Sequence, residues 1–259
     1  MNPLITLPLV VFVVLLELAV GGAVAMLLLD RGDETPVGFL RLAAVVDGAA
    51  AAFGALIAAS LPPEADLAAR PSYALAALMG ATLVITFTPW PRVRRTVEAV
   101  TAIGGVALLI VASTVRFHEQ VSPYDILSLA ALPAGALALG GVDAAMLLGH
   151  WYLVTPKLSP RPLQTAALLF VGALVLQAVL LAVAYARGFV AVAWDANAAA
   201  AVLRIFVGIV APAPIAFAAW WTARMNTQAS TGLLYIALAM VLAGEIMARM
   251  LFYVAGVPI

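Results

Sequence analysis

Hydrophobic residues occur along the chain in long blocks that do not alternate with polar residues. Eight blocks are about 20 residues or longer, and short segments rich in proline, glycine and charge separate them. A hydrocarbon core about 30 Å thick is spanned by roughly 20 residues of α-helix, whereas barrel strands alternate over about ten residues. The blocks therefore predict eight transmembrane helices in one membrane domain over residues 1–259, at about 3–29, 39–61, 72–90, 97–116, 127–154, 163–186, 199–223 and 230–256.

The fifth block is long for one span and contains residues that can bend a helix. Pro133, Gly135 and the pair Gly140-Gly141 lie inside it. Dividing this block in two would reverse the direction of every later helix and would move Arg224 to the outer side. We therefore keep it whole and predict an all-α, polytopic bundle of eight helices.

Composition supports a membrane protein and excludes several other classes. Hydrophobic residues make up 65% of the chain and charged residues 10%, against about 45–50% and about 25% in soluble domains. The mean hydropathy is +1.12. The absence of cysteine excludes disulfide scaffolds, iron–sulfur ligation and thiolate metal sites. Thirteen basic residues balance thirteen acidic ones, so the chain lacks the basic excess of a nucleic-acid binder. We expect the lipid bilayer as a partner and no metal site.

The basic residues predict an orientation. Segments after the first, third, fifth and seventh blocks hold eight of them, and the opposite side holds three. Because basic residues concentrate in cytoplasmic loops, we expect both chain ends on the outer, periplasmic side of the plasma (inner) membrane. The eight are Arg31, Arg41, Arg92, Arg94, Arg95, Lys157, Arg161 and Arg224, and the three are Arg70, Arg116 and Arg187.

Ionisable side chains inside the spans are the candidate functional residues, because each is costly in the bilayer core and such residues often mark ion or substrate pathways. We single out seven of them, grouped by their estimated depth. The outer group is Glu17, Arg204, Glu245 and Arg249, and the inner group is Asp47, Asp143 and His150.

Two interpretations stay open for these groups. Glu245 and Arg249 are four residues apart and share a helix face, so they form either a structural ion pair or, with Arg204, the lining of a polar cavity. Asp47 either bonds a neighbouring helix or takes part in proton transfer. Asp143 follows two glycines, where the helix backbone could open locally. Such an opening is compatible with a structural role for Asp143 and with a functional one.

The two histidines raise the possibility of haem b, which membrane cytochromes bind through two histidines. His118 follows the outer end of the fourth span and His150 lies near the inner end of the fifth. At 1.5 Å per residue, about 36 Å of helix rise separates them, and one haem needs both ligands at one depth. We therefore predict no haem and place His150 in an aromatic belt with Trp151 and Tyr152.

Three parts of the chain form a familiar pattern: residues 7–12 with Glu17 and residues 19–22 near the start, Leu203-Arg204-Ile205, and residues 242–249 followed by 251–253. Together they resemble the membrane anchor subunits of the DMSO reductase family (DmsC-like anchors). Among these elements, Gly244-Glu245 followed by Arg249 and Phe252-Tyr253 is moderately specific. One feature departs from the family, which often has a histidine after the second span, because residues 61–70 contain none.

The resemblance implies a function as well as a layout. Such anchors have eight spans with both ends outside and carry no haem. They exchange electrons with a quinone, menaquinone or ubiquinone, at the outer face, and they hold an iron–sulfur subunit and a molybdopterin catalytic subunit there. By position, Arg204, Glu245 and Arg249 would lie at the quinone pocket, with Glu17 within reach of proton transfer.

Three functional hypotheses follow from the sequence. The first is a quinone-interacting anchor, which has no catalytic residue of its own and needs a partner to carry electrons. The second is a proton- or cation-coupled transporter that uses Glu17, Asp47 and Asp143, although we see no inverted repeat of the kind transporters commonly show. The third is a structural membrane subunit whose polar residues only fix packing.

Overall fold

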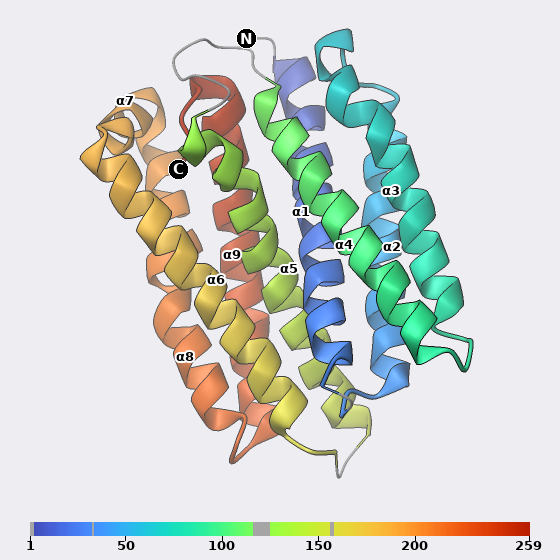
Figure 1. The fold of residues 1–259 in the computed structure, drawn as a ribbon. Helices are drawn as coiled ribbons and strands as arrows, with labels where there is room; N and C mark the ends of the chain where they lie inside the picture. The colour runs from blue at the N-terminus through green and yellow to red at the C-terminus, as the bar shows by residue number, and fades with distance from the viewer. Residues whose placement is uncertain (1–2, 33, 116–124, 156–157) are drawn as a thin grey trace.

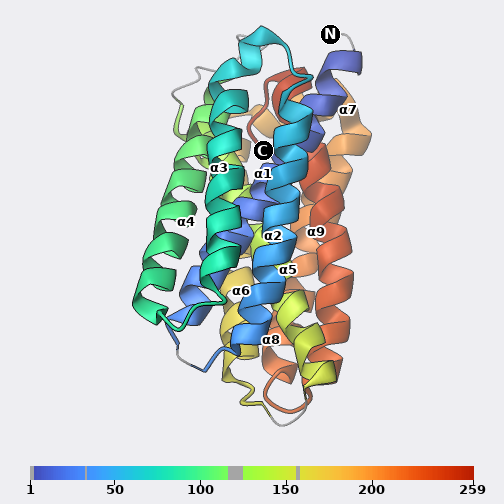
Figure 2. The same ribbon diagram turned by 90° about the vertical axis from the view of Figure 1, so that its right-hand side faces the viewer.

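The computed structural model of the chain is a bundle of helices that run along one long axis (Figures 1 and 2). It describes residues 3–32, 34–115, 125–155 and 158–259. Within these residues, eight helices are long and apolar enough to cross a membrane. The predicted polytopic, all-α fold is confirmed. The helices are α1 Pro3–Asp30, α2 Val37–Ala58, α3 Asp66–Ile85, α4 Pro91–Thr114, α5 Ile126–Val154, α6 Arg161–Ala186, α7 Phe189–Val202, α8 Pro212–Thr222 and α9 Thr227–Ala255, with the short helix η1 Pro63–Ala65 and the π-helix η2 Leu203–Val210.

The helices form two groups of four that lie side by side. In the first group, α1 packs on α2 and α4, and α3 closes the group between them. In the second, α5 packs on α6 and α9, and α8 closes that group. The groups meet mainly along α1 and α5, whose central position agrees with the high burial of α1.

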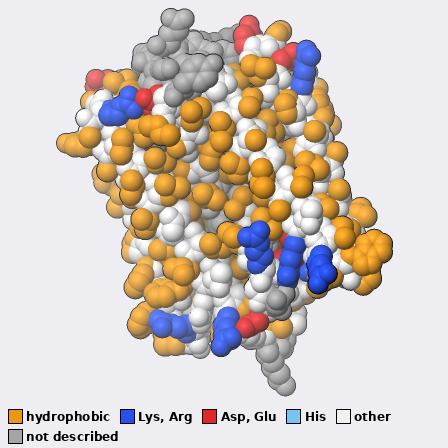
Figure 3. Space-filling model, in the orientation of Figure 1, with side chains coloured by type: hydrophobic (Ala, Val, Ile, Leu, Met, Phe, Trp, Pro, Cys, Tyr) orange, Lys and Arg blue, Asp and Glu red, His pale blue; other side chains and the backbone are white. Residues whose placement is uncertain are grey.

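The two ends of the bundle differ in charge and in what they contain. The start of α1 and the last residues of the chain lie at the same end (Figure 1), which we call the terminal end. On the face in Figure 3, Lys and Arg side chains gather toward the other end, which we call the arginine-rich end. Arg116 and Lys157 lie outside the described residues. The other arginines of the connections divide as expected, with Arg70 and Arg187 at the terminal end and Arg31, Arg41, Arg92, Arg94, Arg95, Arg161 and Arg224 at the arginine-rich end.

Several helices begin earlier than their apolar blocks. Helix α3 starts at Asp66, six residues before the predicted 72, because Asp66 and Arg70 pair with each other across one turn (2.5 Å) at an exposed end. Helix α4 starts at Pro91, not 97, and proline is favoured in the first turn of a helix. Residues 91–96, which we expected in a loop, are therefore helical. The long fifth span is one helix, as predicted.

The seventh span is less regular than predicted. Gly188 adopts a left-handed conformation (φ 81°) and turns the chain from α6 into α7. Asn197 interrupts α7 with extended angles, and its side-chain carbonyl accepts a hydrogen bond from the N–H of Ala200 (3.0 Å). The seventh span was predicted to start at 199, and the helical segment capped by Asn197 starts close to that position. Residues 189–196 form a further helical segment that was not predicted. The π-helix η2 follows, and α8 completes the span.

Candidate functional site

A network of buried charged side chains lies where the two four-helix groups meet. Glu245 on α9 is its centre: one carboxylate oxygen accepts from Arg204 Nη1 (2.6 Å), and the other accepts from Arg249 Nη2 (3.0 Å). Arg249 Nε lies 3.2 Å from a carboxylate oxygen of Glu17 on α1. Glu17, Glu245 and Arg249 are fully buried, and Arg204 is 4% exposed. The four residues of the predicted outer group therefore form one connected site.

Gln177 on α6 is a fifth member of this network, and the sequence reasoning missed it. Its amide nitrogen donates to Glu245 (2.5 Å), to the same oxygen that Arg204 binds. We considered only ionisable residues, and an amide carries no charge. The signal was available, since Gln177 lies in the middle of the apolar run 163–186.

The network is balanced in charge. Two carboxylates face two guanidinium groups, and Arg249 also donates to the backbone carbonyl of Ala131 (3.2 Å). Breaking a buried ion pair by removing one partner costs about 3–5 kcal/mol, because a buried charge is left uncompensated. The arrangement is more extensive than the isolated Glu245–Arg249 pair that the spacing predicted.

Close backbone contacts bring these side chains together. Gly208 of η2 lies against Gly244 of α9, and a Cβ built on Gly244 would lie 2.2 Å from the Cα of Gly208. Arg204 lies one helical turn before Gly208, and Glu245 directly follows Gly244. The contact between the two glycines therefore places Arg204 next to Glu245. π-Helical turns are rare and often occur at functional sites. Small residues let membrane helices approach closely, so the two glycines bring η2 and α9 close enough for the ion pair to form.

The site retains unused hydrogen-bonding capacity. Neither oxygen of Glu17 makes a hydrogen bond, and the side-chain oxygen of Gln177 and the Nε atom of Arg204 also have none. Buried polar atoms without partners are uncommon in folded proteins. The network therefore offers donors, acceptors and protonatable oxygens to a small polar group.

Arg204 and Gln177, both almost fully buried, lie at the edge of the network. Both side chains line a pocket of only about 10 Å³, which Pro258 and Ile259 also line. Ile209 lines this pocket and also a neighbouring groove of about 390 Å³. That groove is apolar, and it runs between α6 and the η2–α8 segment, lined by Val171, Leu174, Val175, Ala178, Ile209, Val210 and Ala213.

The predicted inner group is only partly one site. Asp47 and Asp143 are buried (1% and 6% exposed) and close enough to interact electrostatically. Asp47 points at Gly22 of α1, where a Cβ would lie 2.0 Å from its carboxylate oxygen. Each aspartate has one oxygen without a hydrogen-bond partner.

His150 lies apart from these aspartates. It is exposed, and its Nδ1 lies 2.9 Å from the hydroxyl of Tyr235. Its aromatic neighbour agrees with the interfacial position that we predicted. His118 lies outside the described residues. Among the described residues, no group of three or more His, Asp or Glu side chains is arranged to hold a metal ion.

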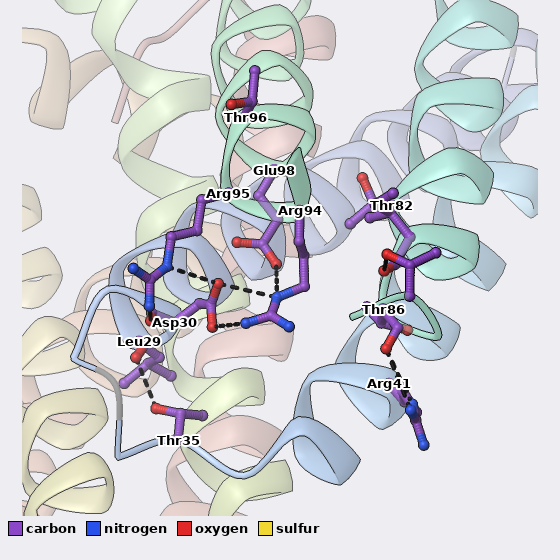
Figure 4. A network of polar contacts seen from close by, with 12 residues as sticks. Leu29, Asp30, Thr35, Arg41, Thr82, Thr86, Arg94, Arg95, Thr96 and Glu98 are labelled. Atoms are coloured by element: carbon purple, nitrogen blue, oxygen red, sulfur yellow. Dashed lines mark hydrogen bonds and ion pairs between the residues drawn. The ribbon is translucent and has the colours of Figure 1, made fainter. Parts of the chain in front are cut away.

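A second charged network, inside the first four-helix group, was not anticipated. Asp30 at the end of α1 accepts two hydrogen bonds from Arg94 (2.6 and 3.1 Å) and two from Arg95, one of them through its backbone carbonyl (Figure 4). Glu98, one turn after Arg94, is fully buried and lies 3.7 Å from it. This network joins α1 to α4 near the arginine-rich end. We missed it because the predicted fourth span began at 97 and left the arginines in a loop.

Comparisons with known proteins give no relative. No family model, no curated protein and no solved structure matches the chain.

Proposed function

We propose that this chain is the membrane anchor and quinone-interacting subunit of a multisubunit respiratory oxidoreductase in the plasma membrane. The observation that carries the proposal is the buried, charge-balanced network beside an apolar groove, since Ile209 lines both that groove and the small pocket at Arg204 and Gln177. The resemblance of the chain ends to DmsC-like anchors points the same way. In this proposal an iron–sulfur subunit, with a molybdopterin subunit, docks at the terminal end and exchanges electrons with the bound quinone.

The chemistry of the site suits a quinone headgroup. Such a site needs an apolar slot and a few convergent polar groups. The unbonded Nε–H of Arg204 would donate to one ring carbonyl of the quinone, and the unbonded side-chain oxygen of Gln177 would accept from a hydroxyl of the quinol. Oxidation of a quinol releases two electrons and two protons; in this proposal the electrons leave to the iron–sulfur partner. Glu17, whose oxygens make no hydrogen bond but which pairs with Arg249, would accept one of the two protons, and Glu245 would accept the other.

The apolar groove would hold the first part of the isoprenoid tail. Its lining residues lie directly beside the pocket, because the two share Ile209. A quinone could then enter from the bilayer between α6 and η2, without passing through water. The proposed orientation puts the terminal end outside, since the arginine-rich end follows the rule for cytoplasmic loops.

The test is photoaffinity labelling of the full chain in membranes with an azido-quinone, followed by peptide mapping. We expect label on α6 and η2 peptides, and competition by excess quinone. The Ala178→Trp variant fills the groove and should reduce labelling at least about tenfold, the value of a lost interaction of about 1.4 kcal/mol. Ala74→Trp is the control: it is also exposed and lies eight residues from its helix end at the terminal end. Equal labelling of the two variants would contradict the proposal.

A proton- or cation-coupled transporter is the second candidate, and Asp47 with Asp143 favours it. Two buried carboxyl groups that are close enough to interact electrostatically, each with an unbonded oxygen, can take up a proton or a cation. Proteoliposomes separate the two functions. Proton or cation flux that is lost in Asp47→Asn, with no quinone labelling, would favour transport. A chain that shows neither property would be a structural subunit.

A further inference from the structure

A second lipid-facing groove lies between α1, α5 and α6. It is on the opposite side of α6 from the apolar groove that we propose for the quinone tail. It has a volume of about 310 Å³ and is lined mainly by apolar side chains and by three glycines. Its lining residues include Leu168, which is 52% exposed, and Leu176, which is 39% exposed. Gly141 and Gly172 leave space in the groove, because a Cβ at either position would meet no atom closer than 3.9 Å, whereas Gly21 lets α1 lie against the backbone of α5.

The groove spans about one leaflet of a bilayer. On α6 it reaches from Leu168 to Leu176, and α6 begins at Arg161 at the arginine-rich end. At 1.5 Å per residue, the groove therefore occupies about 12 Å of α6, between about 10 and 22 Å from that end. Half of a hydrocarbon core is about 15 Å thick. A single acyl chain inserted from the arginine-rich end would fill the groove along its length.

A polar hollow continues the groove at the arginine-rich end. The two share Leu28, and the hollow has a volume of about 190 Å³. Its polar lining comes from Glu34, Thr35, Arg161 and Thr165. Arg161 is well exposed and binds Glu34 through Nη1 (2.9 Å). A guanidinium group has five N–H donors, so this ion pair leaves donors of Arg161 facing the hollow.

Arg161 and Glu34 balance each other in the lining of the hollow, so the positive charge available to an anion comes, among the described residues, from the neighbouring Arg31. Hydrogen bonds from Ser159 and Arg161 hold the pKa of Glu34 below its usual value, so this carboxylate stays ionised and paired. Arg31, just before the lining residue Gly32, is exposed and adds positive charge. A phosphate at this position would meet Arg161 and the hydroxyl of Thr165. Basic residues at a membrane surface attract anionic lipids by about 1 kcal/mol each.

We infer that this combined site binds one anionic phospholipid of the leaflet at the arginine-rich end, with its phosphate at Arg161 and one acyl chain in the groove. A quinone would use the groove but not the hollow, because its headgroup carries no charge. The inference does not depend on the proposed function, since it concerns different residues and a different face of α6. It assigns α6 a lipid on one side and leaves the other side free for the quinone.

The groove is tested with the full chain purified in detergent, delipidated and incubated with palmitoyl-oleoyl phosphatidylglycerol. Native mass spectrometry counts the retained lipid, and we expect one molecule in the wild type. Gly172→Leu places a side chain in the groove without a clash, because a Cβ at Gly172 meets no atom within 4 Å. Lipid retention should fall at least about tenfold, the value of excluding only two methylene groups.

Gly48→Leu is the matched control for this change. Gly48 also has open space around a Cβ, and both glycines lie eleven residues from the first residue of their helix at the arginine-rich end. Retention should be unchanged in this variant. For the headgroup, Arg161→Gln should lower the preference for phosphatidylglycerol over phosphatidylcholine about fivefold. Arg92→Gln removes an exposed charge at the same end and should not.

Three results would overturn the inference: equal lipid retention in Gly172→Leu and wild type, no preference of the wild type for the anionic lipid, or displacement of the lipid by ubiquinone or menaquinone. Labelling the wild type with a phospholipid that carries a diazirine on its acyl chain gives an answer that needs no variant. We expect label on the peptide that contains Leu168–Leu176. Label elsewhere would also refute the site.

Discussion

At the scale of single residues, the buried network around Glu245 depends on the balance between its two carboxylates and its two guanidinium groups. Glu245 receives hydrogen bonds from Arg204, Arg249 and Gln177. No member of this group can be changed without altering the others, because an unpaired buried charge is costly. Function at this site therefore has to be separated from stability by experiments that keep the charge balanced.

A double-mutant cycle on Glu245 and Arg204 tests this balance. Glu245→Gln and Arg204→Gln should each lower the free energy of unfolding by about 3–5 kcal/mol, because each leaves a buried charge. The double variant is neutral again and should be more stable than the sum of the two losses implies. Thermal unfolding in detergent measures all four chains. Strict additivity would mean that the two groups do not interact.

Gly135 gives a second residue-scale prediction. A Cβ at this position would lie 2.6 Å from a carboxylate oxygen of Glu245 and 2.7 Å from one of Glu17. Gly135→Ala should therefore destabilise the chain by about 1–3 kcal/mol, the usual cost of overpacking. Gly141→Ala on the same helix has its nearest contact at 3.9 Å and should be neutral or stabilising, because alanine favours a helix. The melting temperatures of the two variants test this prediction: Gly135→Ala should melt below the wild type and Gly141→Ala should not. Equal melting temperatures would contradict it.

At the scale of helices, the contact between η2 and α9 holds the site together. Gly244→Leu would force these backbones apart and so separate Arg204 from Glu245. We expect a loss of about 1–3 kcal/mol or more together with weaker quinone labelling. Gly232→Leu is the control, since Gly232 lies on the same helix with no atom within 4 Å of a Cβ. A Gly244→Leu variant that behaves like Gly232→Leu would show that the close approach is dispensable.

The helices were predictable from the sequence, and their irregularities were not. Long apolar runs must be helical in a bilayer, because every backbone group needs an internal partner. Helix ends extended beyond these runs where charged residues pair with one another, as Asp66 does with Arg70. The π-helix and the kink at Asn197 depend on packing against α9, and apolar periodicity does not encode that packing.

The sequence predicted which ionisable residues belong to the candidate site, but it did not predict the contacts between them. Depth along the helices grouped Glu17, Arg204, Glu245 and Arg249, and the structure joins them. The same reasoning grouped His150 with Asp47 and Asp143; in the structure His150 is exposed beside Tyr235, whereas the two aspartates are buried. Residues at helix ends, such as Asp30 and Arg94, were assigned to loops and so were not recognised as a network.

At the scale of the whole molecule, two four-helix groups with the same order of contacts meet along α1 and α5. Both groups begin at the terminal end, so they run in the same direction (Figure 1). No repeat is obvious in the sequence. The outer site draws Glu17 from one group and its other members from the second. Relative movement of the groups would therefore change the Glu17–Arg249 distance first, which makes this junction the place where binding and conformation can be coupled.

Orientation in the membrane is the last prediction, and it applies to the whole molecule. The chain contains no cysteine, so single cysteines report on one position each. Arg92→Cys serves for the arginine-rich end because Arg92 is exposed, whereas Arg94 is buried and bonded to Asp30. Glu64→Cys, also exposed, serves for the terminal end. With the positive-inside rule, an impermeant maleimide should label Glu64→Cys in right-side-out vesicles and label Arg92→Cys only after permeabilisation.

The reverse labelling pattern would have consequences beyond topology. The network at Glu245 would then lie toward the cytoplasm, and an iron–sulfur partner at the terminal end would have to be cytoplasmic. The phospholipid groove would open to the outer leaflet, where its preference for an anionic lipid could be measured in the same way. Labelling of both cysteines from one side would contradict the eight-span bundle itself, because a single span, α3, separates the two positions. The measurement thus fixes the side of the membrane on which the partner subunit of the proposed function has to dock.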